Sequence, residues 1–325
     1  MRYFAERLHP YLSQQGIQGL TDYCHKTNHN LLFKLLLSID ERCFGYAKFA
    51  SDWVAFESRL QDETIAQVCS DFFTYMGLKV LTNRVPEAFR KPTNPAILLG
   101  INHDAVIEPL IIASLLKRQD IRFVGMKVFQ YLGKHISDLI FPVLPKKVAI
   151  NYQGHNGRTL KSRLDIVLEL YRMESLTLAE IERLNCTSLK GAAEHIENGG
   201  LLIIFPNGGR SIEHAWYPGV GKMTKHLPET LTAKVPIFPI RTSGICRKQL
   251  KKCVRLAAQG NPQHTSVRTR IFDPIHLPPE TASMSPDEIV NYLRARTESR
   301  ISTVSDGEQG GSVAKQVAVS RPILY

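Results

Sequence analysis

The sequence has no long apolar run. A membrane-spanning helix needs about 18 or more consecutive apolar residues, and the longest apolar stretches here, residues 31–39 and 109–116, are far shorter. The first residues, MRYFAERLHPYL, also lack the uninterrupted apolar core of a secretory signal peptide. We therefore expect a protein without spanning segments, either soluble in the cytoplasm or peripheral on a membrane surface.

Closely spaced cysteines are missing as well. The six cysteines are scattered over the 325 residues and include no C-x-x-C pair, which argues against a disulfide scaffold and for reduced thiols in a cytoplasmic setting. His25 and His29 are four residues apart, but no third ligand candidate is near them in the sequence. We therefore predict no metal site and no bound cofactor.

Acidic residues are fewer than basic residues. The chain has 41 Lys and Arg against 30 Asp and Glu, a net charge of +11, and residues 247–270 hold seven Lys or Arg and no acidic residue. Such an excess favours an anionic partner: membrane headgroups, a phosphorylated ligand or an acidic carrier protein. A solvated basic face explains residues 247–270 equally well. Because no nucleic-acid-binding module accompanies the charge, we expect no nucleic-acid partner.

Several catalytic motifs are also absent. There is no G-x-S-x-G nucleophile elbow, no G-x-x-x-x-G-K-[ST] loop and no G-x-G-x-x-G fingerprint. These absences argue against the common serine hydrolases, P-loop nucleotide hydrolases and dinucleotide-binding enzymes.

What the sequence does contain indicates an α/β fold. Apolar runs of strand length occur at 96–101, 122–125, 201–205 and 235–240. Helical stretches are expected from Pro109, at 160–172, at 188–198, and from the capping box of Ser285 and Glu288 to about 301. Apolar strands without alternation, separated by helices, predict a mixed, largely parallel sheet flanked by helices on both faces.

The ends of the chain differ from this central part. In residues 1–88 apolar side chains recur at helical spacing, at 31–39 and again at 65–73, which predicts a smaller helical N-terminal domain. Three prolines within 84–95 indicate a linker. We expect an α/β domain over 89–304 and a loose Gly-, Ser- and Gln-rich tail over 305–325.

Two polar segments follow directly after predicted strands, where ligands bind in open α/β sheets. In the first, His103 leaves a strand and Glu108 begins a helix five residues later. The carboxylate can fix the imidazole tautomer, so that the free ring nitrogen accepts a proton from a nucleophile. In the second, two glycines allow close backbone approach to a ligand, and Arg210 offers a planar fork of donors for phosphate. Taken alone, the first segment is more typical of a structural histidine, and the second is slightly more typical of an ordinary turn with a surface arginine.

Together, the blocks resemble the glycerolipid acyltransferase family. NHDAVIEP at 102–109 is similar to that family's N-H-x-x-x-x-D block, FPNGGRS at 205–211 to F-P-x-G-x-R, and VPIFPI at 235–240 to V-P-x-x-P. The G-G-R sequence and the following Trp-Tyr-Pro at 216–218 resemble the soluble plastid-type glycerol-3-phosphate acyltransferases. The likeness covers residues 90–245 and is weak toward the ends.

This resemblance implies transfer of a fatty acyl group from acyl-CoA or acyl-ACP to a hydroxyl of glycerol 3-phosphate or a related phosphorylated glycerolipid acceptor, in phospholipid biosynthesis. His103 is then the general base and Glu108 its carboxylate. The substrate-binding residues implied are Lys146, Lys147, Asn207, Gly208, Gly209, Arg210, Ser211 and, on the acyl side, Pro236.

The sequence also departs from the family pattern. Glu108 replaces an aspartate, and Ile212 stands where the plastid type has a second arginine. A lysine-histidine pair of that type is Lys147-Val148 here, and many family members have glutamate at the position of Asn207. A phosphate clamp with fewer cations implies altered acceptor recognition. Two rival functions therefore stay open: a catalytically silent lipid-binding relative, and a thioesterase-like hydrolase in which His103 activates water.

Overall fold

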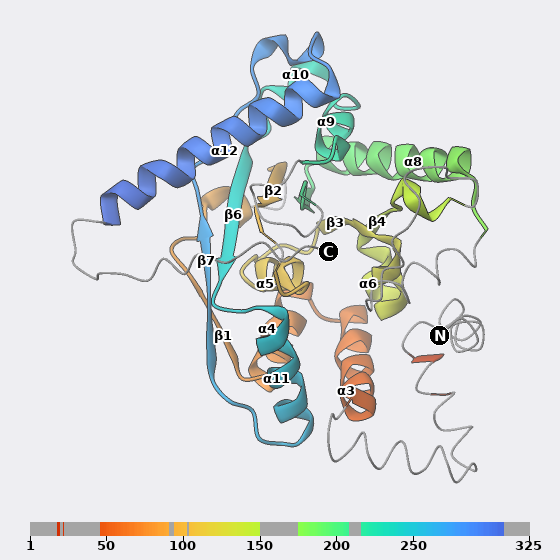
Figure 1. Ribbon diagram of the computed structural model, residues 1–325, viewed down its shortest axis with the longest axis vertical. Helices are drawn as coiled ribbons and strands as arrows, with labels where there is room; N and C mark the ends of the chain where they lie inside the picture. The colour runs from red at the N-terminus through yellow and green to blue at the C-terminus, as the bar shows by residue number, and fades with distance from the viewer. Residues whose placement is uncertain are drawn as a thin grey trace.

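The computed structural model describes residues 18–19, 22, 46–90, 94–102, 104–149, 175–207 and 216–308. Seven strands form one sheet with helices on both faces (Figure 1). The strands are β1 Leu78–Thr82, β2 Ala96–Gly100, β3 Ile121–Met126, β4 Ile140–Val143, β5 Leu201–Ile204, β6 Ile237–Ser243 and β7 Thr265–Ile271. The helices are α3 Tyr46–Ser58, α4 Ile65–Tyr75, α5 Glu108–Ser114, α6 Lys134–Asp138, α8 Leu178–Glu197, α9 Gly219–Thr224, α10 Glu229–Thr232, α11 Arg247–Ala258 and α12 Pro286–Glu308. Short 3-10 turns lie at Arg59–Gln61 (η1), Glu87–Phe89 (η2), Lys127–Leu132 (η3), Lys146–Val148 (η4) and Pro279–Ala282 (η5).

The sheet is largely parallel, as predicted. Its strand order is β1-β7-β6-β2-β5-β3-β4, and every neighbouring pair is parallel except β6 and β7. Strand β2 lies near the middle, and all five of its residues are buried. Ala96 and Leu98 pack with α4, α5 and α11 on one face, whereas Ile97 and Leu99 pack with α8, α9 and α12 on the other. Burial on both faces explains why the strand is apolar without alternation.

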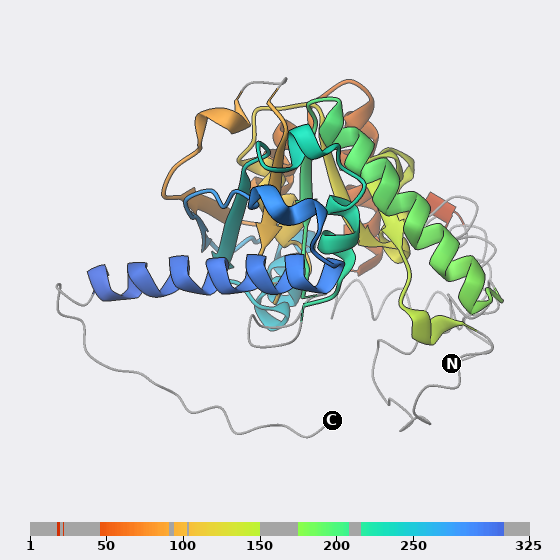
Figure 2. The ribbon, with the colours of Figure 1, turned by 90° about the horizontal axis from the view of Figure 1, so that it is seen from above.

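The two long helices lie on the same face of the sheet and extend toward opposite ends of the strand order. Helix α8 lies beside β4 and β5, and α12 extends past β6 and β7 (Figures 1 and 2). The predicted capping box of α12 is present, with Ser285 N donating to Glu288 Oε2 at 2.6 Å. The helix continues to Glu308, beyond the predicted end near 301 and into the predicted tail. Helix α8 begins ten residues before the predicted helix of 188–198, at a capping box of Thr177 and Glu180.

The helical prediction for residues 1–88 needs one correction. Helices α3 and α4 are present, but residues 78–82 form β1, which pairs with β7 in the main sheet. Gly77, with φ +72, ends α4 and turns the chain into that strand, and a Cβ there would lie 2.6 Å from the carbonyl oxygen of Gln263. The predicted helices at 31–39 and 160–172 and the chain beyond 308 lie outside the described residues. The division into domains at residue 88 stays a prediction.

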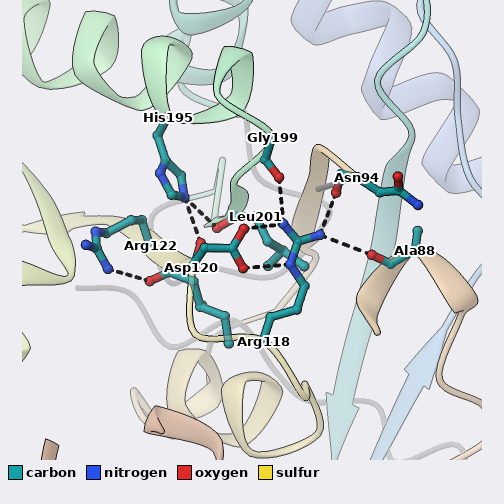
Figure 3. Close-up of polar contacts among 9 residues, drawn as sticks. Ala88, Asn94, Arg118, Asp120, Arg122, His195, Gly199 and Leu201 are labelled. Atoms are coloured by element: carbon teal, nitrogen blue, oxygen red, sulfur yellow. Dashed lines mark hydrogen bonds and ion pairs between the residues drawn. The ribbon is translucent and has the colours of Figure 1, made fainter. Parts of the chain in front are cut away.

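A buried arginine links the segments that precede β2, β3 and β5, at the edge of the sheet where these strands begin (Figure 3). Arg118 is 1% exposed, and its Nε donates to Asp120 Oδ1 at 2.7 Å. Its other nitrogens donate to the carbonyl oxygens of Ala88, Asn94 and Gly199. A guanidinium is stable in the interior when its donors are paired in this way. The segments that lead into β2, β3 and β5 are therefore held together at this edge.

Candidate active site at the carboxyl edge of the sheet

The opposite edge, where β2, β5 and β6 end, carries the two polar segments singled out from the sequence. Asn102 follows β2 and bonds to the backbone of Thr242 in β6. Its Nδ2 donates to the Thr242 carbonyl oxygen at 2.6 Å, and its Oδ1 accepts from the Thr242 N–H at 2.9 Å. The two-way contact fixes the point at which the chain leaves β2.

A second asparagine fixes the other segment to the same point. Asn207 follows β5, is fully buried, and donates from Nδ2 to the carbonyl oxygen of Ile101 at 2.5 Å. Ile101 is the residue directly after β2. The residues that lead into the first and second predicted segments are thus joined by a hydrogen bond, although they are 106 positions apart.

The far side of the second segment returns to the same place. The N–H of Tyr217 donates to the carbonyl oxygen of Pro206 at 2.7 Å. Trp216 is buried in the core beside α9. Both described ends of the Gly-rich segment therefore lie at the carboxyl end of β5.

Five of the predicted site residues lie outside the described residues: His103, Gly208, Gly209, Arg210 and Ser211. Their roles stay predictions. What the structure provides is the position of the backbone before and after them.

Glu108 lies at the start of α5 and is 1% exposed. Its Oε1 accepts from the N–H of Ala105 at 2.6 Å, which closes the turn between β2 and the helix. Pro109 occupies the first turn of α5, where a missing N–H costs no hydrogen bond. A carboxylate this deeply buried is costly unless several donors or a cation face it. Its place between a core helix and a strand end suits a carboxylate that orients another group.

The same turn contains a strained residue. Val106 has φ 78, a left-handed conformation that costs a residue with a Cβ roughly 1–3 kcal/mol. Val106 lies between His103 and Glu108 in the sequence. Strain of this kind persists where the surrounding structure imposes it, and it gathers at functional sites.

The two lysines lie at the same edge of the sheet but further along it. Lys146 and Lys147 form η4 after β4, which is separated from β5 by β3. The Nζ of Lys146 is 2.6 Å from Glu182 Oε1 on α8, and this ion pair lowers the pKa of Glu182. Both side chains are about half exposed, so the pair is weak and a stronger anion can replace the glutamate.

Pro236 lies at the other edge of the sheet. Its carbonyl oxygen accepts from the N–H of Ile97, near the start of β2. From there to the paired Gly100 and Ile240 is about four residues of strand, or roughly 13 Å. The structure therefore does not bring Pro236 to the carboxyl ends of β2 and β5, and a role for it in substrate binding stays a prediction.

The sequence did not indicate two of the polar residues that hold this architecture, Thr242 and Arg118. Thr242 lies beyond the predicted apolar run of 235–240, near the end of β6, and acts through its backbone, which no motif reveals. Arg118 resembles any surface arginine of a loop. Asn102 stands within the recognised NHD sequence, and its place directly after a strand is the signal that points to it.

Comparison with known proteins gives a likeness in structure but none in sequence family. No protein-family model matches the chain, and no curated protein matches it. Among solved structures it is similar to the 1-acyl-sn-glycerophosphate (LPA) acyltransferase PlsC from Thermotoga maritima. The TM-score is 0.37 and the sequence identity 16%, over 95% of this chain and 97% of that chain. The function proposed below is therefore based on this chain's own residues.

Within the described residues, none of the helices is both long enough and apolar enough to cross a membrane.

The basic stretch of 247–270 is divided between two elements, α11 and β7. Helix α11 buries Cys253, Val254 and Ala257 and exposes its lysines and arginines. A single basic helix face is thus available for an anionic surface.

Proposed function

We propose that the protein is an O-acyltransferase that moves a fatty acyl group from a thioester to a hydroxyl of glycerol 3-phosphate or a related phosphorylated glycerolipid acceptor. The observation that carries the proposal is the hydrogen bond from Asn207 to Ile101. Because of this bond, the chain enters the His103 segment and the Arg210 segment at one point of the sheet edge. Buried Glu108 stands at the start of the helix that follows.

In this proposal His103 is the general base and Glu108 orients it. The acceptor oxygen attacks the thioester carbonyl carbon while the imidazole takes the hydroxyl proton, and the carboxylate stabilises the imidazolium. Backbone N–H groups stabilise the negative charge on the carbonyl oxygen in the tetrahedral intermediate. When that intermediate collapses, the carbon–sulfur bond breaks and the thiolate takes the proton back from the imidazolium. Neither a metal nor a covalent acyl-enzyme is part of this scheme.

The acceptor phosphate is assigned to Arg210, Lys147 and the glycine backbone at 208–209. Guanidinium and ammonium groups bind phosphate through charge-assisted hydrogen bonds, which are stronger than neutral ones. Lys146 can join them by exchanging its exposed contact with Glu182. Peripheral contact with anionic membrane through the basic face of α11 belongs to the same proposal.

The experiment that tests this function follows the fate of a labelled acyl group. Purified protein is incubated with radiolabelled palmitoyl thioester, as coenzyme A or carrier-protein conjugate, with and without glycerol 3-phosphate, and the lipids are extracted. Acceptor-dependent lysophosphatidic acid is the expected product.

Two other outcomes contradict the proposal, and each supports a different rival. Free fatty acid formed at the same rate with and without the acceptor identifies a hydrolase. Thioester that binds but stays intact with every phosphorylated glycerolipid acceptor identifies a silent lipid-binding relative.

A further inference from the structure

A cavity of about 600 Å³ lies on the α12 side of the sheet, outside the segments assigned above. Strands β1, β6 and β7 form its floor, and Ile301 of α12 contributes to its wall. Three arginines of the strands, Arg241, Arg268 and Arg270, also line it, with Leu81 of β1 and Phe272 just after β7.

The strand register brings the three arginines to one face. Arg241 in β6 is directly opposite Arg270 in β7, and Ser243 is opposite Arg268. Directly paired residues point to the same side of a sheet, with Cβ atoms about 5 Å apart, and like charges so placed repel. The antiparallel pair of β6 and β7 therefore concentrates positive charge on one face of the sheet.

The carboxylate that follows β7 is paired with an arginine outside this group. Asp273, just after β7, pairs with Arg84 at 2.6 Å. Within the described part of the chain, neither Arg241 nor Arg268 forms an ion pair, and both are exposed. Two guanidinium groups with their donors available thus face a hollow lined by apolar atoms.

The chemistry of the lining selects the kind of ligand. Guanidinium forks match the geometry of phosphate oxygens, and a cavity of several hundred Å³ holds a ligand much larger than one phosphate. Leu81, which is 38% exposed, provides apolar surface for a ring system. Phe272 is buried beneath Arg270, whose Cζ is 6.0 Å from the ring centroid. A ligand with several phosphates and an aromatic base fits this combination better than a headgroup with one phosphate.

The cavity also adjoins the candidate active site. Arg241 is followed by Thr242, whose backbone Asn102 holds through two hydrogen bonds. We propose that the arginines of β6 and β7 bind the phosphates of coenzyme A, so that the acyl thioester of this donor extends toward the carboxyl end of β2. This inference rests on the proposed acyl transfer and names its donor.

The test is direct binding of free coenzyme A by calorimetry, which needs no turnover. Replacing Arg241 and Arg268 together by glutamine is expected to weaken binding at least about tenfold, since each charge-assisted contact is worth roughly a factor of ten. Arg90→Gln, at an exposed arginine that follows η2 near the edge of the sheet where β2 begins, is the matched control and leaves the affinity unchanged. Dephospho-coenzyme A is expected to bind more weakly than coenzyme A, and pantetheine not at all.

Thermal melting separates lost binding from lost folding. Arg241→Gln removes a repelling charge, so the ligand-free variant is expected to melt no lower than the wild type. Saturating coenzyme A then raises the melting temperature of the wild type and of Arg90→Gln but not that of the double variant.

Several results overturn the inference. The first is a wild-type protein that fails to bind coenzyme A, and the second is equal affinity for coenzyme A in the wild type and the double variant. The third is arginine-dependent binding of inorganic phosphate or phosphatidate vesicles that is as tight as the binding of coenzyme A. Because binding is measured without acceptor, each of these leaves acyl transfer from a carrier protein untouched. Conversely, protein that binds coenzyme A through the arginines but forms no acylated lipid contradicts the proposed function alone.

Discussion

Single residues in the turn after β2 carry the most specific chemistry. Glu108 is nearly inaccessible to solvent, and its Oε1 accepts a hydrogen bond from the N–H of Ala105. A neutral side chain of the same shape can keep this hydrogen bond, so the effect of the charge on turnover can be measured separately. The strain at Val106 is likewise confined to one residue.

Replacing Glu108 by glutamine is expected to preserve the fold and reduce turnover. The amide oxygen can still accept from Ala105, but it no longer stabilises an imidazolium, so kcat falls by at least about 100-fold. Glu108→Asp is the matched control, because it keeps the charge and restores the residue of the resembling family, and it is expected to retain more activity than the amide. Steady-state kinetics with melting curves checks this, and a fully active Glu108→Gln enzyme would exclude the assigned role.

Val106→Gly is expected to leave stability equal to or up to about 1 kcal/mol above that of the wild type. The left-handed backbone costs a residue with a Cβ about 1–2 kcal/mol, and glycine removes that cost. The neighbouring Ile107 has φ −94, so Ile107→Gly gains no such relief and is expected to lose about 1 kcal/mol or more. Urea unfolding of both variants decides the matter. Equal destabilisation by the two glycines would show that Val106 is not strained.

Among the elements, the strand ends at the carboxyl edge depend on two asparagines. Asn207→Asp keeps the size of the side chain but loses the N–H group that donates to the carbonyl oxygen of Ile101. The buried carbonyl is then unpaired beside a carboxylate, so the free energy of unfolding is expected to fall by about 1–3 kcal/mol. Asn198→Asp is the control, because that asparagine ends α8 at the other edge and is exposed. Chemical denaturation measures both, and equal stability of Asn207→Asp and the wild type would contradict the role of this bond.

Strands buried on both faces were predictable from the sequence, and strands that alternate buried and exposed residues were not. Strands β2 and β5 are entirely buried, and their apolar runs identify them. Strand β7, with the sequence TSVRTRI, alternates buried and exposed residues and carries arginines outward. Its sequence therefore predicts no strand and reads as the end of the basic stretch of 247–270. The polar first half of α8 was missed for a related reason, because most of its residues are exposed.

The candidate site shows the same division. The motifs supply the residue types and their order, because those are local properties of the sequence. The contact of Asn102 with Thr242 joins positions 140 apart, and only the folded sheet reveals it. For the same reason, no local pattern indicates that Arg241 and Arg270 lie opposite each other.

At the scale of the whole molecule, the two edges of the sheet have different tasks. One edge is held by Arg118 and by His195, whose Nε2 is 2.8 Å from the carbonyl oxygen of Asp120. The other edge carries the candidate site. Stability and activity should therefore respond to different substitutions and different pH ranges.

Burial lowers the pKa of His195 below its ordinary value, and the charge of Arg122 lowers it further. The unfolded chain therefore binds this proton more readily than the folded protein, so stability falls as the pH falls below about 6.5. Glutamine can donate to the same carbonyl without titrating. His195→Gln is thus expected to lose less stability than the wild type when the pH falls from 7.5 to 5.5. The carboxylates whose pKa is lowered titrate below this pH range and do not contribute to the difference. Urea unfolding at the two pH values measures this, with exposed His264→Gln as the control. An unchanged pH dependence in His195→Gln would contradict the assignment.

The central claim is that His103 is the base of an acyl transfer at the carboxyl edge. Its most direct test compares the initial rate of labelled lysophosphatidic acid formation by the wild type, His103→Ala and His264→Ala, each shown to melt at the same temperature. We expect a rate about 10²–10⁴-fold lower for His103→Ala alone, the usual contribution of a general base. Equal rates for the two alanine variants would contradict it.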